Sequence, residues 1–119
     1  MSRNYSLYLQ DAVAAIDRIA LYIEGVDRGK FETDQMRLDA VIRNLQIIGE
    51  AIKKIPNSIQ KKYSNIPWRE IAGLRNRITH VYFDVDINII WDVVHSELPI
   101  LKTQIQEIIG EIDECISGN

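Results

Sequence analysis

The sequence predicts an all-α protein, an antiparallel bundle of four or five helices. Apolar residues recur every three or four positions along several segments, which is the spacing of a helix face. No segment shows the sustained period-two alternation of a strand, and the prolines fall at segment boundaries rather than in a linker. Because 119 residues of 46% hydrophobic composition can bury one apolar core, we expect a single domain over residues 1–119.

Two long helices are predicted first. The apolar stripe of the first contains Leu9, Val13, Ile16, Ala20 and Ile23. Gly25 and Gly29 then indicate a short turn, and Thr33 and Asp34 can cap the next helix. Pro56 ends this second helix, whose stripe contains Leu38, Val41, Leu45, Ile48, Ile52 and Ile55.

The second half of the chain predicts a short helical turn and a loop over residues 57–66, followed by two more helices. Pro67 suits the first position of a helix over about residues 68–82. Its inward residues are Ile71, Leu74, Ile78 and Val81. Asp84 and Asp86 suit the start of the last helix, which keeps its apolar register through Pro99 and should kink there. Its stripe contains Ile87, Trp91, Val94, Leu98, Leu101, Ile105, Ile108 and Ile112.

Composition excludes several classes of protein. Cys115 is the one cysteine, so neither an internal disulfide nor a cysteine-rich zinc site is possible. The N-terminus is polar, and no apolar run is long enough to span a membrane, so we expect a soluble cytoplasmic protein with no membrane partner.

Charge is unevenly distributed along the chain. Residues 43–80 carry eight basic and two acidic residues, a balance of +6, between flanks of −2 and −7. The net charge of −3 argues against a protein that coats nucleic acid indiscriminately. The basic middle either forms a local phosphate-attracting surface or neutralises the acidic helices of the bundle.

Residues 73–82, GLRNRITHVY, contain an unusual set of polar groups. On a continuous ideal helix, Arg75 and Tyr82 would stack at the edge of the buried arc, whereas Asn76, His80 and Arg69 would share the open face. The segment holds no carboxylate, so we expect no metal and no cofactor. It does hold the groups that metal-independent RNA cleavage requires.

In such a cleavage the 2′-OH of RNA attacks the adjacent phosphate. His80 suits the proton transfer, Arg75 suits the phosphate oxygens, and Asn76 could orient either the imidazole or the phosphate. One histidine per segment is short of an acid–base pair, which a two-fold dimer would complete. The alternative is structural: Arg75 and His80 could cap a helix C-terminus, and Tyr82 could be packing.

The string Arg75-x-x-x-x-His80-x-Tyr82, with Asn76 directly after the arginine, resembles the signature of the HEPN superfamily, and more narrowly the HepT toxins of HepT/MntA toxin–antitoxin modules. Further landmarks are residues 43–51 (RNLQIIGEA), 66–68 (IPW) and 82–86 (YFDVD) and the helix of Trp91. They occur in the expected order, so the resemblance covers about residues 5–112.

The resemblance implies a helical bundle that forms a homodimer through its motif-bearing face. It implies a metal-independent endoribonuclease toxin with Arg75 and His80 as the catalytic pair, assisted by Asn76. It also implies a cognate MntA-like nucleotidyltransferase antitoxin that attaches AMP from ATP to Tyr82. Two alternatives remain at this point: a non-catalytic RNA- or nucleotide-binding module, and a structural partner subunit of a nucleotidyltransferase complex.

Other charged residues have more general interpretations. Arg77, Arg69, Lys53 and Lys54 are candidate contacts for RNA phosphates, although solvated lysines are commoner. Glu50 is expected to form a structural ion pair, with Arg43 or Arg75 as its partner. His95 is expected to be packed or exposed rather than catalytic.

Overall fold

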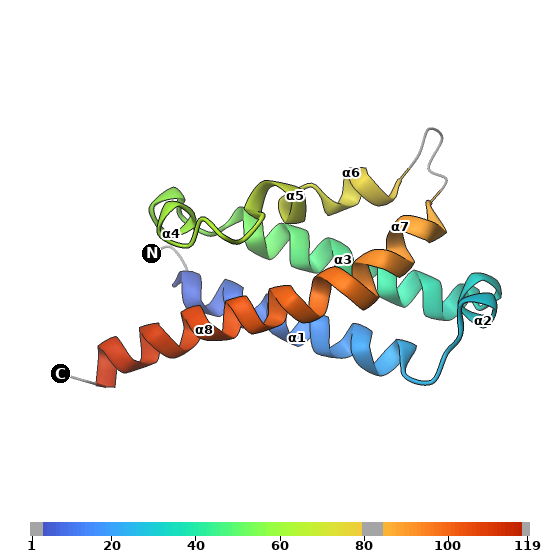
Figure 1. The fold of residues 1–119 in the computed structure, drawn as a ribbon, viewed down its shortest axis with the longest axis horizontal. Helices are drawn as coiled ribbons and strands as arrows, with labels where there is room; N and C mark the ends of the chain where they lie inside the picture. The colour runs from blue at the N-terminus through green and yellow to red at the C-terminus, as the bar shows by residue number, and fades with distance from the viewer. Residues whose placement is uncertain (1–3, 80–84, 118–119) are drawn as a thin grey trace.

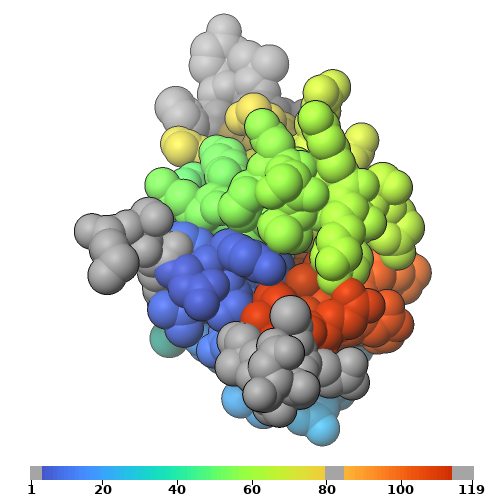
Figure 2. Space-filling model, turned by 90° about the vertical axis from the view of Figure 1, so that its left-hand side faces the viewer, coloured from blue at the N-terminus to red at the C-terminus, as the bar shows by residue number. Residues whose placement is uncertain are grey.

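The computed structural model describes residues 4–79 and 85–117, with the backbone alone from residue 114 onward. The described chain is a bundle of helices measuring 52 × 30 × 27 Å, which confirms the all-α prediction (Figure 1). Helices α1 (Tyr5–Ile23) and α3 (Gln35–Lys53) form its most extensive contact. Helix α8 (Leu98–Ser117) packs beside α1, and both are visible at the end of the bundle nearest α4 (Figure 2). Within the described residues, no helix is both long and apolar enough to cross a membrane.

The stripe predicted for the second long helix is confirmed at every position. Its six residues, from Leu38 to Ile55, are all buried. Asp34 caps α3 through a 3.1 Å hydrogen bond from the Arg37 amide, and its pKa is lowered because that amide and the Arg37 side chain both donate to the carboxylate. Asn44, also buried on α3, accepts a 2.7 Å hydrogen bond from Arg18 of α1. This bond ties the two long helices together across their interface.

Two details of the N-terminal half differ from the prediction. On α1, Ile19 is buried and Ala20 is exposed, because the larger side chain takes the inward position at the end of the stripe. Gly25 makes the predicted turn with φ of 70°, but Gly29 lies inside a short helix, α2 (Arg28–Thr33). That helix forms because Asp27 caps it, and its residue Phe31 is fully buried.

The predicted single helix over residues 68–82 is wrong. The chain forms two short helices, α5 (Trp68–Ala72) and α6 (Leu74–Ile78), separated at Gly73. Thr79 is extended (φ −112°, ψ 128°) and pairs antiparallel with Val85, and the Asp86 amide donates to the Ile78 carbonyl at 2.8 Å. This pairing takes the carbonyl that the next helical turn would use. Accordingly, the helix cannot continue past Ile78.

The three inward residues of this segment that the structure describes, Ile71, Leu74 and Ile78, are buried as predicted, and Val81 lies outside the described residues. The preceding short helix is confirmed as α4 (Asn57–Lys62). Pro67 is the residue before α5 rather than its first helical position.

The last predicted helix is continuous but not uniform. It comprises α7 (Ile87–Asp92), a π-helical turn η2 (Val93–Glu97) and α8. Asp86 caps α7 by accepting from the Ile89 amide, as predicted, while Asp84 lies outside the described residues. The irregularity falls in the turn before Pro99. There the Leu98 amide donates to Val93, five residues back, and this wider turn accommodates the proline ring.

Helix α5 packs directly against α3 at Gly49. A Cβ built at Gly49 would lie 3.4 Å from the carbonyl oxygens of both Ile71 and Ala72, which is van der Waals contact. A bulky side chain that extends beyond Cβ would therefore push α5 off α3. Gly110 on α8, by contrast, has no neighbouring atom within 4 Å of its virtual Cβ.

We predict opposite effects from the same substitution at these two glycines. Gly49→Leu should lower the free energy of unfolding by about 1–3 kcal/mol, because it overpacks the α3–α5 contact. Gly110→Leu should raise it by a few tenths to about 1 kcal/mol, because leucine favours a helix interior over glycine. Urea denaturation of both variants measures the difference, and equal shifts at the two positions would contradict the close approach.

Candidate functional site

Helix α6 presents Arg75 and Asn76 to solvent at the surface of the bundle. Both side chains are exposed, while Leu74 and Ile78 on the same short helix are buried and fix its orientation. Arg75 and Asn76 line a hollow of about 510 Å³. Gln46 and Lys53 from α3 line its other side, so the hollow lies between α6 and α3.

Arg75 makes no hydrogen bond or ion pair with any residue of the described ranges 4–79 and 85–117. Its guanidinium is a planar, permanently charged fork that fits the oxygens of a phosphate. Arg75, beside an exposed amide, can therefore bind an anion without first breaking a contact with any described residue.

The structure changes the predicted grouping around Arg75. Because α5 and α6 are separate helices, Arg69 does not join Asn76 on one face; it lines another hollow with Lys61, Ser64 and Glu70. The stacking of Tyr82 over Arg75 was expected for a helix that continues beyond Ile78, and α6 ends at Ile78. His80 and Tyr82 themselves lie outside the described residues.

Arg77 is held by an ion pair. Its two terminal nitrogens donate to the two carboxylate oxygens of Glu97 at 3.0 and 2.8 Å. The hydrogen bond that Arg77 donates to Glu97 raises the pKa of Arg77, so the guanidinium stays charged at any ordinary pH. This geometry occupies the fork that a phosphate would need, and it attaches α6 to the π-helical turn η2.

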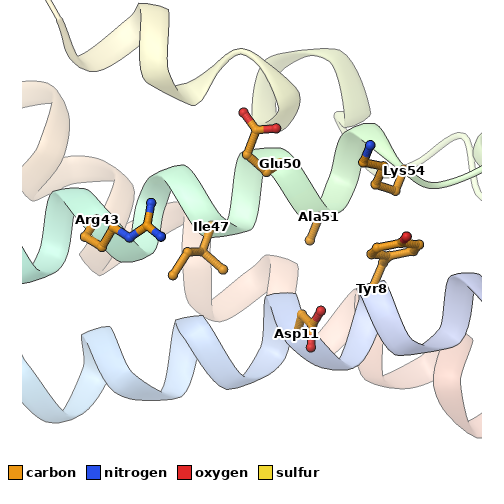
Figure 3. Close-up of a pocket in the computed structure, with 7 residues that line it drawn as sticks. All are labelled: Tyr8, Asp11, Arg43, Ile47, Glu50, Ala51 and Lys54. Atoms are coloured by element: carbon orange, nitrogen blue, oxygen red, sulfur yellow. The ribbon is translucent and has the colours of Figure 1, made fainter. Parts of the chain in front are cut away.

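A second hollow adjoins the first along α3, and a third follows it. Arg43, Gln46, Glu50, Lys53 and Arg75 all line the second. Arg43 and Glu50 continue into the third, where Lys54 also contributes (Figure 3). Residues from α1, Tyr8 and Asp11, form the opposite wall of this third hollow (Figure 3).

The structure thus brings Lys53 together with Arg75 and Asn76, and adds two residues that were not assigned a phosphate-binding role from the sequence, Arg43 and Gln46. Their spacing was a usable signal: residues 43, 46, 50 and 53 step by three, four and three, parallel to the buried stripe. Glu50 pairs with Lys53 at 3.5 Å rather than with Arg43 or Arg75. That pair lies on the surface, so it contributes little to stability.

His95 matches its prediction as a packed or exposed residue. It is exposed, its ring lies 4.0 Å from that of Trp91, and its Nδ1 contacts the Trp91 carbonyl oxygen at 2.9 Å. In the part of the chain that the structure describes, no three His, Cys, Asp or Glu side chains cluster as metal ligands would.

Comparisons with known proteins identify the family of the chain. The family model described as "Ribonuclease HepT-like" matches residues 13–108. The chain belongs to the HepT-like ribonuclease family. The "Probable ribonuclease HepT" of Thermococcus cleftensis is 38% identical over 108 residues, which cover 91% of this chain and 98% of that protein.

Two proteins of Methanocaldococcus jannaschii are similar at comparable levels. One, named "Putative RNase", is 37% identical over 112 residues, which cover 94% of this chain and 97% of that protein. The other, named "Gamma-glutamylcyclotransferase and putative RNase", is 38% identical over 114 residues. Those residues cover 96% of this chain but only 51% of that longer relative, so the chain spans about half of its length. No solved structure matches the chain significantly.

The two arginines of α6 should behave differently when they are substituted. Arg77→Gln and Glu97→Gln should each lower the free energy of unfolding by about 1 kcal/mol, a value discounted because a third of each side chain is solvent-exposed. Arg75→Gln, which breaks no contact with a described residue, should leave stability unchanged. Thermal denaturation followed by circular dichroism compares the three variants, and an equal loss in Arg75→Gln would contradict its being unpaired.

Proposed function

We propose that this protein is a metal-independent endoribonuclease with Arg75, Asn76 and His80 at its catalytic centre. The observation that carries the proposal is the exposed Arg75, which has no partner among the described residues, beside Asn76 in a hollow that Lys53 also lines, in a chain of the HepT-like ribonuclease family. The placement of His80 in this centre rests on its position in the sequence motif and on the family resemblance.

The proposed reaction is an internal transesterification. The 2′-oxygen of a ribose attacks the neighbouring phosphorus, and the bond from phosphorus to the 5′-oxygen of the next nucleotide breaks. The products carry a 2′,3′-cyclic phosphate and a 5′-hydroxyl end. One proton leaves the 2′-hydroxyl for a base, and one is donated to the departing 5′-oxygen by an acid.

Each residue has a distinct role in this scheme. Arg75 binds the non-bridging phosphate oxygens and stabilises the extra negative charge of the five-coordinate phosphorus. Asn76 donates its amide to the phosphate or orients the imidazole. His80 transfers protons, because imidazole is the side chain whose pKa lies nearest neutrality.

We further propose that the active form is a homodimer. The scheme needs a base and an acid in the same turnover, whereas the motif supplies one histidine per chain. A two-fold axis beside α6 would bring two motifs into one cleft and supply both groups.

Regulation would follow from modification of Tyr82 by a cognate MntA-like nucleotidyltransferase, which makes the protein the toxin of a cytoplasmic toxin–antitoxin module. In that reaction the Tyr82 oxygen attacks the α-phosphorus of ATP, pyrophosphate leaves, and the phenolic proton passes to solvent. The attached phosphate carries negative charge close in sequence to Arg75 and His80. It would compete with RNA for the same cations.

The cleavage proposal predicts a specific pattern of activity. The purified wild-type chain should cleave labelled cellular RNA in excess chelator and leave 2′,3′-cyclic phosphate ends. Arg75→Ala and His80→Ala should each lose at least about 100-fold in rate, as expected for removal of a charge-stabilising or proton-transferring group.

Gel electrophoresis with end-group analysis measures this outcome, and Lys30→Gln is a matched control that removes a cation from α2. If the wild type left the RNA intact, the cleavage proposal would be refuted. The remaining interpretations would be an RNA-binding module or a partner subunit. Cleavage that stops in chelator would refute the metal-independent mechanism.

Regulation by AMP addition predicts a separate result. Incubation with a cognate MntA-like nucleotidyltransferase and ATP should add AMP to the wild type and abolish cleavage. Tyr82→Phe should accept no AMP and stay active, because the phenol is the acceptor and not part of the cleavage scheme. Intact-mass spectrometry beside the cleavage assay tests both statements, and an AMP-bearing protein of full activity would contradict the proposed competition.

A further inference from the structure

We propose that one face of α3 binds the phosphates of the RNA strand as it leaves the catalytic centre, with Arg43 as its principal contact and Glu50 as an element that weakens binding. We call this face, made of Arg43, Gln46, Glu50 and Lys53, the α3 stripe. The inference rests on the proposed ribonuclease activity and extends it to the path of the substrate.

The arginines of the protein divide into two groups. Four of those in the described ranges donate to acceptors within the protein: Arg18 to Asn44, Arg28 to Glu32, Arg37 to Asp34, and Arg77 to Glu97. Three have no partner among the described residues, namely Arg43, Arg69 and Arg75.

Two of the three unpaired arginines, Arg43 and Arg75, line the same hollow. Arg69 borders a separate one. Two exposed arginines that line one hollow are a ready site for an anion, since neither has to give up a bond to a described residue to bind it.

Neighbouring hollows along α3 share lining residues. The hollow of Arg75 and Asn76 shares Gln46 and Lys53 with the next one, which in turn shares Arg43 and Glu50 with the third. From residue 43 to residue 53 the helix rises about 15 Å, at ~1.5 Å per residue. This length suits a few successive nucleotides of a single strand.

The chemistry of the α3 stripe fits a polynucleotide better than a single small anion. Gln46 is half-buried and can donate to or accept from sugar and base groups, whereas the cations on either side of it meet the backbone. Arg43 and Lys53 lie at the two ends of the stripe, so one phosphate cannot engage both at once. A strand can.

Glu50 lies between these cations and opposes them. Its side chain is 64% exposed and its ion-pair partner, Lys53, is 52% exposed, so the pair is solvated and weak. The carboxylate points to the side of α3 away from α1, where the hollow of Arg75 lies (Figure 3). A phosphate bound there would be repelled by it. Removal of this charge should therefore tighten RNA binding.

The test uses three single variants that each replace a charged residue with glutamine. Arg43→Gln and Glu50→Gln alter the α3 stripe. Lys30→Gln is the control, because Lys30 is an exposed cation on α2 and lines none of the three hollows. Glutamine forms helices well, so each variant should fold, which circular dichroism verifies.

Binding is measured by fluorescence anisotropy of a fluorescein-labelled single-stranded oligoribonucleotide, with His80→Ala in every protein so that the probe stays intact. Arg43→Gln should raise Kd about tenfold and reduce the slope of log Kd against log salt by about one. Glu50→Gln should lower Kd by a few-fold, and Lys30→Gln should change it less than twofold. In the active proteins, Arg43→Gln should raise KM more than it lowers kcat.

Three results would overturn the inference. Equal weakening by Arg43→Gln and Lys30→Gln would indicate net charge alone. An unchanged or weaker affinity in Glu50→Gln would remove its opposing role. A change in oligomeric mass with Arg43→Gln at constant Kd would assign the α3 stripe to contact between copies of the chain.

The failure of the underlying activity is recognised separately. If the wild type leaves RNA intact while the Kd values follow the expected order, the ribonuclease proposal fails and the α3 stripe still binds RNA. If cleavage occurs and Kd is insensitive to Arg43→Gln and Glu50→Gln, the activity stands and the α3 stripe has no part in it.

Discussion

The close approach of α3 to α5 is the constraint on which the candidate site depends. Gly49 leaves room for two backbone carbonyls of α5 at its surface, and α6 follows α5 after a single residue, Gly73. The position of Arg75 is therefore set by the absence of a side chain on a different helix. Arg75 lies 22 residues after Lys53 and 32 residues after Arg43 in the sequence, and the backbone packing of α5 on α3 brings the three to one hollow.

The sequence predicted most where the helix periodicity was longest. All six residues of the stripe predicted for the second long helix are buried, five of them on α3 and Ile55 just after it, and both aspartates expected to cap described helices, Asp34 and Asp86, do so. The prediction failed where a hydrogen bond from a later segment of the chain determines the backbone conformation. The end of α6 at Ile78 depends on a bond from Asp86, and no local preference of Thr79 indicates that partner. A period of three or four cannot reveal a pairing formed by a later segment of the chain.

The chemistry of the candidate site was predictable from the sequence, but the full set of residues that line it was not. The motif residues Arg75 and Asn76 line one hollow. Arg69, which a continuous helix would place on the same face as Asn76, lines another, because the helix is interrupted at Gly73. Arg77 differs from Arg75 by two positions, and only the structure distinguishes them: Arg77 is held by Glu97, twenty residues later, and Arg75 has no partner among the described residues. Arginine serves here both as a structural tie and as a candidate anion site. Sequence position alone does not separate the two uses.

The π-helical turn before Pro99 implies that this bundle tolerates changes of chain length unequally. A hydrogen bond that spans five residues encloses one residue more than a regular helical turn, so η2 holds a residue in excess. If one residue of η2 were deleted, the turn could become regular α-helix, and the helices on either side of it would keep their packing contacts. Loss of one residue within α3 would instead rotate everything after it by about 100° and turn Lys53 away from Arg75. Insertions and deletions among relatives of this protein should therefore collect near residues 93–97 and avoid α3.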